Sequence, residues 1–312
     1  MFSLARLALA SVIANVGIVV TGGAVRLTDS GLGCPTWPRC TDESYTTTAE
    51  MGIHGAIEFG NRMLTYVVGL IALACFVVAW RQRPRRRPLV LLAGAVLAGV
   101  PLQGVVGGLT VLTNLNPWVV GLHFLASMAM LVAAYALWRA ARGADAADAD
   151  AAGADAEVVP APLRALGWVV AAASLAVLVV GTWVTGSGPH SGDHGAKRNG
   201  LDPETISQVH ADLVFLLVGL SVAAWLALLA VGARRAARAA LVLIGVELAQ
   251  GLVGFVQYFT GLPQVLVGAH MLGACLVWLA TLALLAAVIR TDLRPPERVD
   301  AATPPAKIKA SL

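Results

Sequence analysis

Residues 206–231 read ISQVHADLVFLLVGLSVAAWLALLAV, a run that contains one acidic residue, Asp212, and no Lys or Arg. An α-helix rises 1.5 Å per residue, so about 20 such residues cross the ~30 Å hydrocarbon core of a bilayer. Lipid offers no partner to backbone amides, and a helix satisfies all of them within the run. We therefore predict a transmembrane helix here.

Seven further apolar runs of similar length occur, at about residues 7–25, 52–80, 89–112, 118–138, 165–184, 240–260 and 265–289. The chain is 58% hydrophobic and 13% charged, whereas soluble domains carry about a quarter charged residues. The predicted fold class is an all-α integral membrane protein with eight transmembrane helices. The first run also has the basic start of a cleavable signal peptide, but no small-residue cleavage site precedes Arg26.

Basic residues gather in the loops on one side of these runs. Segment 81–87 holds five arginines, and Arg234, Arg235 and Arg238 lie between the sixth and seventh runs. The positive-inside rule makes this side cytoplasmic, with both termini inside a plasma membrane. The net charge of +4 is then a topology signal. We expect contact with membrane lipid and none with nucleic acid.

An Ala/Asp repeat divides the chain. Residues 143–157 read GADAADADAAGADAE, which has no apolar face and is typical of a disordered linker. The predicted parts are a four-helix bundle at 1–142, a linker at 143–163, a second four-helix bundle at 164–290 and a cytoplasmic tail at 291–312. Gln103-Gly-Val-Val-Gly107 matches Gln250-Gly-Leu-Val-Gly254 at an offset of 147. We expect two tandem, parallel repeats related by an axis along the membrane normal.

Four histidines follow the repeat. His123 matches His270 at the offset of 147, and His54 matches His210 at 156. Each lies near the start of an even-numbered run, on the predicted outer side. A single membrane histidine often makes only a hydrogen bond between helices. Four at matching depth favour axial ligation of haem iron by a pair of imidazoles in each half.

Glu58 and Arg62 lie on one face of the second run, together with His54 and Asn61. An acid and a base within a span are costly and mark function by default. Their spacing of four, acid first, also suits a structural salt bridge. The second half has Val214 four residues after His210 and no equivalent pair. This asymmetry indicates that one half does chemistry and the other carries a cofactor.

Two cysteines, Cys34 and Cys40, lie in the first outer loop, where a disulfide is permitted and the short gap can close a ring. Cys75 and Cys275 lie within spans and are expected to behave as small apolar residues. Glu247 and Asp212 are intramembrane acids, either proton carriers or structural partners. His190 and His194 share an outer loop that is either a metal site or, more simply, a solvated or propionate-contacting loop.

These residues together resemble the haem A synthase family. The likeness spans about residues 10–290. In the first half it rests on the segment Arg26-Leu-Thr-Asp-Ser-Gly-Leu-Gly-Cys34 with Trp37-Pro and Cys40, on Ile57-Glu58-Phe with Asn61-Arg62, and on Gln103 with Gly107-Gly108 leading to His123. In the second half it rests on Val184-Thr-Gly-Ser-Gly-Pro-His190-Ser-Gly-Asp193, on His210, and on Gln250 leading to His270.

The resemblance implies an oxidoreductase that converts a ring methyl of haem O to the formyl group of haem A. It implies haem B as cofactor on His210 and His270, haem O as substrate on His123, Glu58 as the essential acid and Arg62 in support. Cys34 and Cys40 match an outer-loop pair found in one branch of the family. The implied partners are a haem O-producing farnesyltransferase as donor and the assembly factors of a terminal oxidase.

One position departs from the family pattern, in which a second substrate-side histidine follows the acid by three residues. That position is Asn61 here. His54 lies on the same face, about 10 Å further out along the helix from Asn61, and we expect it to replace the missing ligand. Otherwise the substrate iron has only His123 and an open position.

Two other functions share parts of this pattern. A di-haem b-type cytochrome that passes electrons from quinol to a partner would use the same histidines, but it leaves Glu58 unexplained. A transporter built from parallel repeats would need charged or broken helices at mid-membrane, and beyond Pro101 and Glu247 the chain offers few.

Overall fold

The computed structural model describes residues 3–149 and 159–289. Within them lie eight α-helices and a short 3-10 helix, η1 (Ala49–Met51), and no strand. The helices are α1 (Leu4–Leu27), α2 (Gly52–Arg81), α3 (Arg87–Leu112), α4 (Pro117–Ala149), α5 (Ala161–Ser187), α6 (Pro203–Ala230), α7 (Arg234–Phe259) and α8 (Gln264–Ile289). All eight are long and apolar enough to cross a membrane, which confirms the predicted fold class.

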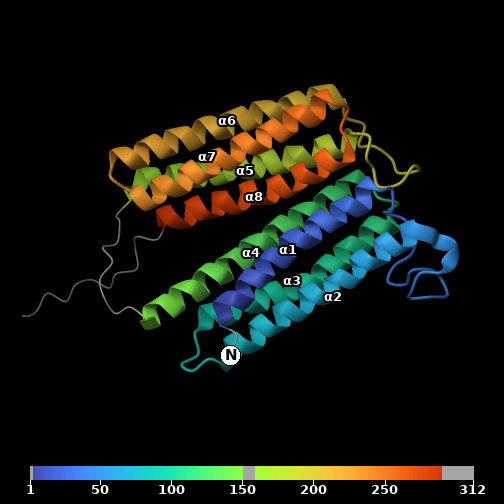
Figure 1. Cartoon of the computed structure of the whole chain (residues 1–312), viewed down its shortest axis with the longest axis horizontal. Helices are drawn as coiled ribbons and strands as arrows, with labels where there is room; N and C mark the ends of the chain where they lie inside the picture. Colours follow the sequence, from blue (N-terminus) through green and yellow to red (C-terminus); the bar gives the residue numbers. More distant parts are fainter. Residues whose placement is uncertain (1–2, 150–158, 290–312) are drawn as a thin grey trace, which may run out of the picture.

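The helices pack as two groups of four (Figure 1). In the first group α1 contacts α2 and α4, and α3 contacts the same two helices. In the second group α5 and α7 each contact both α6 and α8. Within the described residues α2 does not contact α4, nor does α6 contact α8, so these helices stand at opposite corners of their groups.

The two groups share a buried seam. It is formed where α1 and α4 meet α8 and where α4 meets α5. Its core contains Met128 and Leu131 of α4, Leu178 of α5 and Trp278 of α8. The indole N–H of Trp278 donates a hydrogen bond to the carbonyl of Met128 at 3.0 Å.

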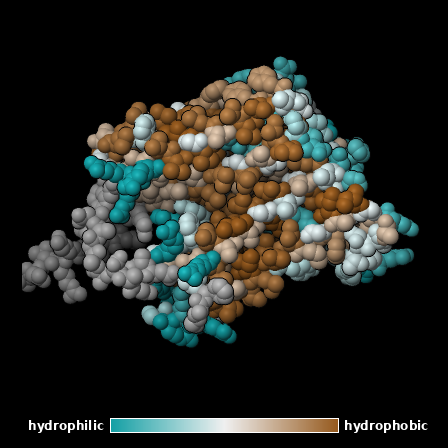
Figure 2. Space-filling model, in the orientation of Figure 1, coloured by the Kyte–Doolittle hydropathy of each residue, from teal (hydrophilic) through white to brown (hydrophobic). Residues whose placement is uncertain are grey.

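The two ends of the molecule differ in composition. One end, here called the loop end, carries segments 28–51, 113–116, 188–202 and 260–263. The opposite, arginine end carries the short connections 82–86 and 231–233. Figure 2 shows apolar residues over the flanks between them and hydrophilic residues at both ends. Large apolar side chains such as Leu70, Leu91 and Val242 are exposed along the helices, as expected for a surface in lipid.

Two helix starts, those of α1 and α6, carry a side-chain cap. The Ser3 hydroxyl accepts a hydrogen bond from the Arg6 amide at the start of α1, and an Asp202 oxygen accepts one from Thr205 at the start of α6. Pro203 then occupies a first-turn position, where no amide proton is needed. The cap at Asp202 fixes where the loop 188–202 ends and hence the depth of His210 in α6.

The predicted linker is shorter than expected. Residues 143–149 continue α4, and α5 already includes 161–163. Alanine has the highest helix propensity, so an Ala-rich extension of a long helix stays helical despite its Asp content. Most of the rest of the linker, 150–158, and the tail at 291–312 lie outside the described residues. The division into two repeats with separate haem sites stays a prediction.

Candidate functional site

Three histidines occupy the same place in their helices. His123 of α4, His210 of α6 and His270 of α8 are each the seventh or eighth residue of the helix. Each ring is half-buried and lies against a glycine of the preceding helix. The Cβ position of that glycine lies 3.1 to 3.2 Å from ring atom Cε1, the glycines being Gly107, Gly181 and Gly254 in the same order. A side chain at these positions would displace the imidazole.

His210 and His270 lie seven or eight residues into α6 and α8, the helices at opposite corners of the second group. Nδ1 of His123 and of His270 is buried, and no hydrogen bond to it is found among the described residues. In His210 and His270, Nδ1 lies 3.6 to 3.7 Å from the Cβ position of the glycine behind the ring, so the other ring nitrogen, Nε2, is the one that could bind a ligand. Two imidazoles at one depth are the donor set of a six-coordinate haem.

A glutamine fixes the backbone behind two of the rings. The Gln250 amide donates to the His270 carbonyl at 2.8 Å, and Gln103 donates to the His123 carbonyl at 3.4 Å. The two glutamines that match in sequence thus make the same contact.

His54 lies in different surroundings. It is the third residue of α2 and is exposed, and its Nδ1 is 3.0 Å from the Ser30 hydroxyl. It lines a cavity of about 380 Å³ at the loop end, with Asp29, Asp193 and His194 among its other lining residues. The structure therefore places His54 about a turn further out than the three half-buried histidines. Its role as a substrate-haem ligand stays a prediction.

Asn61 holds the place that a fourth half-buried histidine would take. Its amide Nδ2 lies 3.8 Å from the Cβ position of Gly22 in α1, the preceding helix. The Thr21 hydroxyl donates to Asn61 Oδ1 at 2.7 Å. The sequence repeat missed this correspondence because it aligned His54 with His210. The equivalent positions are identified instead by the glycine on the preceding helix that contacts each of the three histidines and Asn61.

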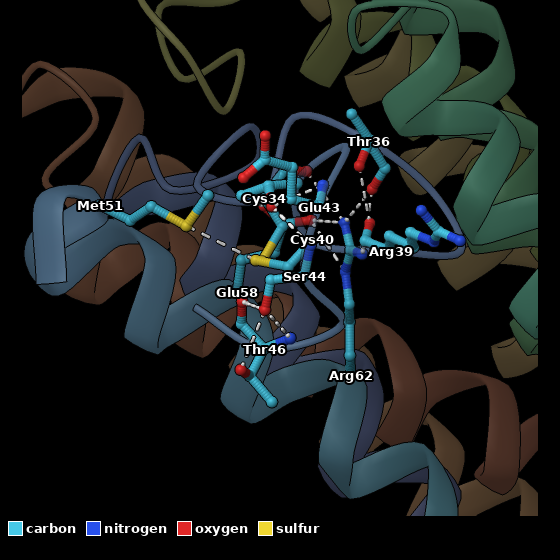
Figure 3. The surroundings of a disulfide bond; sticks show 11 residues. Cys34, Thr36, Arg39, Cys40, Glu43, Ser44, Thr46, Met51, Glu58 and Arg62 are labelled. Carbon is cyan, nitrogen blue, oxygen red and sulfur yellow. Dashed lines mark hydrogen bonds and ion pairs between the residues drawn. A yellow bond between two sulfur atoms is a disulfide. The ribbon is translucent and has the colours of Figure 1, made fainter. Parts of the chain in front are cut away.

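Glu58 and Arg62 form a salt bridge at 2.5 Å. One oxygen of Glu58 accepts hydrogen bonds from the Arg62 guanidinium, and the other accepts the Cys34 amide at 2.5 Å. Arg62 also donates to the carbonyls of Cys34, Thr36 and Arg39 (Figure 3). Glu58 is only 5% exposed. The pair therefore ties α2 to the first loop.

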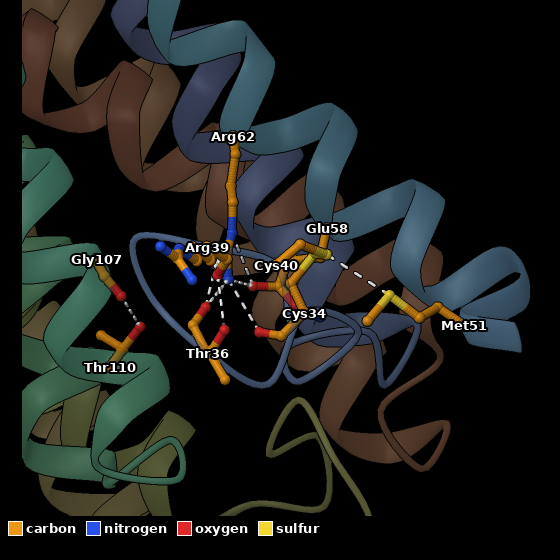
Figure 4. Close-up of polar contacts among 9 residues, drawn as sticks. All are labelled: Cys34, Thr36, Arg39, Cys40, Met51, Glu58, Arg62, Gly107 and Thr110. Carbon is orange, nitrogen blue, oxygen red and sulfur yellow. Dashed lines mark hydrogen bonds and ion pairs between the residues drawn. A yellow bond between two sulfur atoms is a disulfide. The ribbon is translucent and has the colours of Figure 1, made fainter. Parts of the chain in front are cut away.

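That loop is closed by the predicted disulfide, Cys34–Cys40, which is confirmed. We call residues 34–40 the disulfide loop. Its Trp37 packs on α3, where a Cβ on Gly108 would overlap the indole ring. Gly108 adjoins Gly107, which backs His123, and Figure 4 shows the loop beside this part of α3. The disulfide loop thus covers the His123 side of the first group of helices.

The other acids and histidines are placed apart from this arrangement. Asp212 is exposed and accepts a hydrogen bond from Gln208 on the same helix face. Glu247 is 3% exposed and accepts the Ser221 hydroxyl at 2.8 Å. His190 lies 2.9 Å from the Leu262 carbonyl. Within the described residues no three His, Cys, Asp or Glu side chains group as metal ligands.

Cys75 and Cys275 are buried free thiols, as expected.

Comparison with known proteins identifies the chain. The model of the COX15-CtaA family, described as cytochrome oxidase assembly protein, matches residues 5–190, more than half of the sequence. The chain belongs to this family. The match covers the Glu58 pair, the disulfide loop and His123, and it extends through α5 into the following loop.

Curated relatives of the family carry a common name. Heme A synthase of Alkalihalophilus pseudofirmus is 32% identical over 132 residues, 41% of this chain and 44% of that protein. Heme A synthase of Bradyrhizobium sp. is 30% identical over 201 residues, 54% of this chain and 53% of that protein. Heme A synthase of Symbiobacterium thermophilum is 35% identical over 107 residues, 34% of this chain and 34% of that protein. Each alignment spans about half or less of the relative's length.

Proposed function

We propose that this protein is a haem A synthase, which oxidises a ring methyl of haem O to a formyl group. The observation that carries the proposal is the set of three half-buried imidazoles, each backed by a glycine at one depth of its helix group. Membership of the COX15-CtaA family and the names of the relatives support it. The products would serve assembly of a terminal oxidase.

The second group of helices holds the haem B cofactor in this proposal. His210 and His270 would hold it, because they lie seven or eight residues into helices at opposite corners of the group. Bound there, haem supplies one-electron transfer. Gln250 holds the backbone of His270 in place for this role.

The first group of helices receives haem O as substrate. His123 would bind its iron, and Trp37 of the disulfide loop, which packs beside the glycine behind His123, would exclude water from that side of the pocket. Conversion of a methyl to a formyl group takes up an oxygen atom, which water supplies in this proposal, and releases electrons to an external acceptor and protons to nearby bases. Because the electrons leave before the protons, a positive charge develops on the substrate. The Glu58 carboxylate would stabilise this charge or accept a proton, and Arg62 would keep Glu58 ionised.

A positioning role for Glu58 is the second reading of the same geometry. Both its oxygens are already engaged, one by Arg62 and one by the Cys34 amide. In that case the residue holds the disulfide loop over the substrate and touches no reacting atom. The two readings forecast different results for one variant.

Glu58→Gln separates them. The substitution keeps the shape of the side chain and one acceptor oxygen but removes the charge. A chemical role requires that haem A formed per mole of folded, haem-loaded protein falls to near background. A positioning role requires that activity falls only in step with folded protein. Breaking a fully buried pair costs about 3–5 kcal/mol, and the cost is lower here because Arg62 is 20% exposed. Val214→Glu, which adds an acid in the other half, should not restore activity.

Pigment extraction tests the proposed function as a whole. The protein is expressed with and without a haem O source, and haems are extracted and separated. Haem A or hydroxylated haem O that appears only with both components supports a synthase. Haem B alone supports the di-haem cytochrome, and absence of haem overturns both.

A further inference from the structure

Four glycines occupy one place in the fold. Gly22, Gly107, Gly181 and Gly254 each lie five or six residues before the end of an odd-numbered helix. Three of them back an imidazole of the next helix, and Gly22 backs the amide of Asn61. The same glycine contact therefore occurs four times, with a histidine in three cases and with Asn61 in the fourth.

Asn61 also stands at the correct corner. His210 and His270 project from α6 and α8, which contact α5 and α7 but not each other. In the first group α2 and α4 have the same relation to α1 and α3. Asn61 comes from α2 and His123 from α4. Asn61 therefore lies opposite His123, as His210 lies opposite His270.

The orientation of the Asn61 amide is set by Thr21. The Thr21 hydroxyl is 2.7 Å from Asn61 Oδ1 and 3.2 Å from the Ile18 carbonyl, so we assign its proton to the shorter contact. The amide oxygen is then occupied, and the Nδ2 hydrogens have no acceptor among the described residues. A neutral amide with an engaged oxygen is a poor ligand for iron but a good hydrogen-bond donor.

We infer that the haem iron held by His123 has an open axial position, and that Asn61 donates a hydrogen bond to a diatomic ligand bound there. This inference rests on the proposed function, which places a haem in the first group of helices. His54 does not fill the open position, because it is exposed at the helix start and engages Ser30. The two haems then differ: one is closed by two histidines, and the other is open on the Asn61 side.

Carbon monoxide is the probe for the open position. Full-length protein co-expressed with a haem O source is purified, reduced and exposed to the gas. Carbon monoxide should bind one of the two haems, and His123→Ala should remove that haem. Asn61→His should abolish binding and convert the haem to a low-spin form with two histidines. His54→Ala should leave binding unchanged.

The donor role needs a separate measurement. Asn61→Leu keeps the position open but removes the donor, so carbon monoxide should dissociate about tenfold faster, the effect of one lost hydrogen bond. The infrared C–O stretch should move to higher frequency. Thr21→Val frees the amide, and the single C–O band should broaden or split. An unchanged rate and band in Asn61→Leu would overturn the donor role.

Other outcomes overturn the open position itself. Wild-type protein that binds no carbon monoxide, with binding gained in His54→Ala, would make His54 the sixth ligand. If His270→Ala loses the gas-binding haem and His123→Ala keeps it, that haem lies in the second group of helices, which contradicts the proposal. Failure of the proposed function is recognised independently, since pigment extraction would then show no haem A or hydroxylated haem O whatever the gas binds.

Discussion

At the scale of single residues, the absence of a side chain at four positions shapes the interior of both helix groups. Glycine usually weakens a helix by roughly 0.5–1 kcal/mol relative to alanine. At Gly107, Gly181 and Gly254 that loss leaves room for an imidazole ring within van der Waals reach. Replacing these glycines should therefore affect ligand binding more than helix stability.

Gly254→Val should sharply lower the haem content of the second helix group. The Cβ position lies 3.1 Å from His270 Cε1, and the added methyl groups would push the ring off its axis. Gly251→Val is the matched control, because it lies on the same helix with nothing within 4 Å of its Cβ position. Haem per mole of purified protein is measured in both variants. Equal loss in the two would mean that the helix, and not the ring, is disturbed.

His210→Ala and His270→Ala should each remove the tightly held low-spin haem B while the protein stays inserted in the membrane. Loss of one axial imidazole leaves the iron without a strong-field pair. Absorption and electron paramagnetic resonance spectra of the purified variants measure their content of low-spin haem. Low-spin haem at wild-type content in both variants would contradict the assignment of this pair.

At the scale of elements, the disulfide loop is held by α2 through one guanidinium. Arg62 reaches three backbone carbonyls and one carboxylate, which a planar group with five N–H donors can do and an ammonium cannot. Arg62→Lys should leave the disulfide intact but loosen the loop, so that trypsin cleaves after Arg39. Arg81→Lys, at the far end of the same helix, is the control. Equal protection in both variants would assign loop order to the disulfide alone.

Apolar run length predicted every transmembrane helix, because crossing a bilayer demands about 20 apolar residues whatever else the helix does. The linker boundary was wrong, since a low-hydrophobicity Ala/Asp segment can be helical by propensity alone. Sequence offsets found the histidines but paired His54 with His210. The loops before α2 and α6 differ in length, so the offset between the halves did not pair Asn61 with His210. The family resemblance pointed to Asn61, and its contact with Gly22 gives the structural reason.

At the scale of the whole molecule, the starts and ends of the described chain lie at the arginine end. We propose that this end faces the cytoplasm, by the positive-inside rule. Single cysteines introduced as Glu43→Cys in the loop end and Gln82→Cys in the arginine end test it. A membrane-impermeant maleimide applied to intact spheroplasts should label the first and spare the second. The reverse pattern would invert the topology.

The hydrogen bond from Trp278 to Met128 has a consequence for unfolding. Small polar interfaces let neighbouring domains melt separately, whereas a large apolar one joins them. Here the seam core draws on α1, α4, α5 and α8, so neither helix group can lose its packing without exposing that of the other. The chain should therefore denature in one cooperative transition and release both haems at the same temperature. Trp278→Ala should lower that temperature for both haems together, although its side chain belongs to only one of the groups.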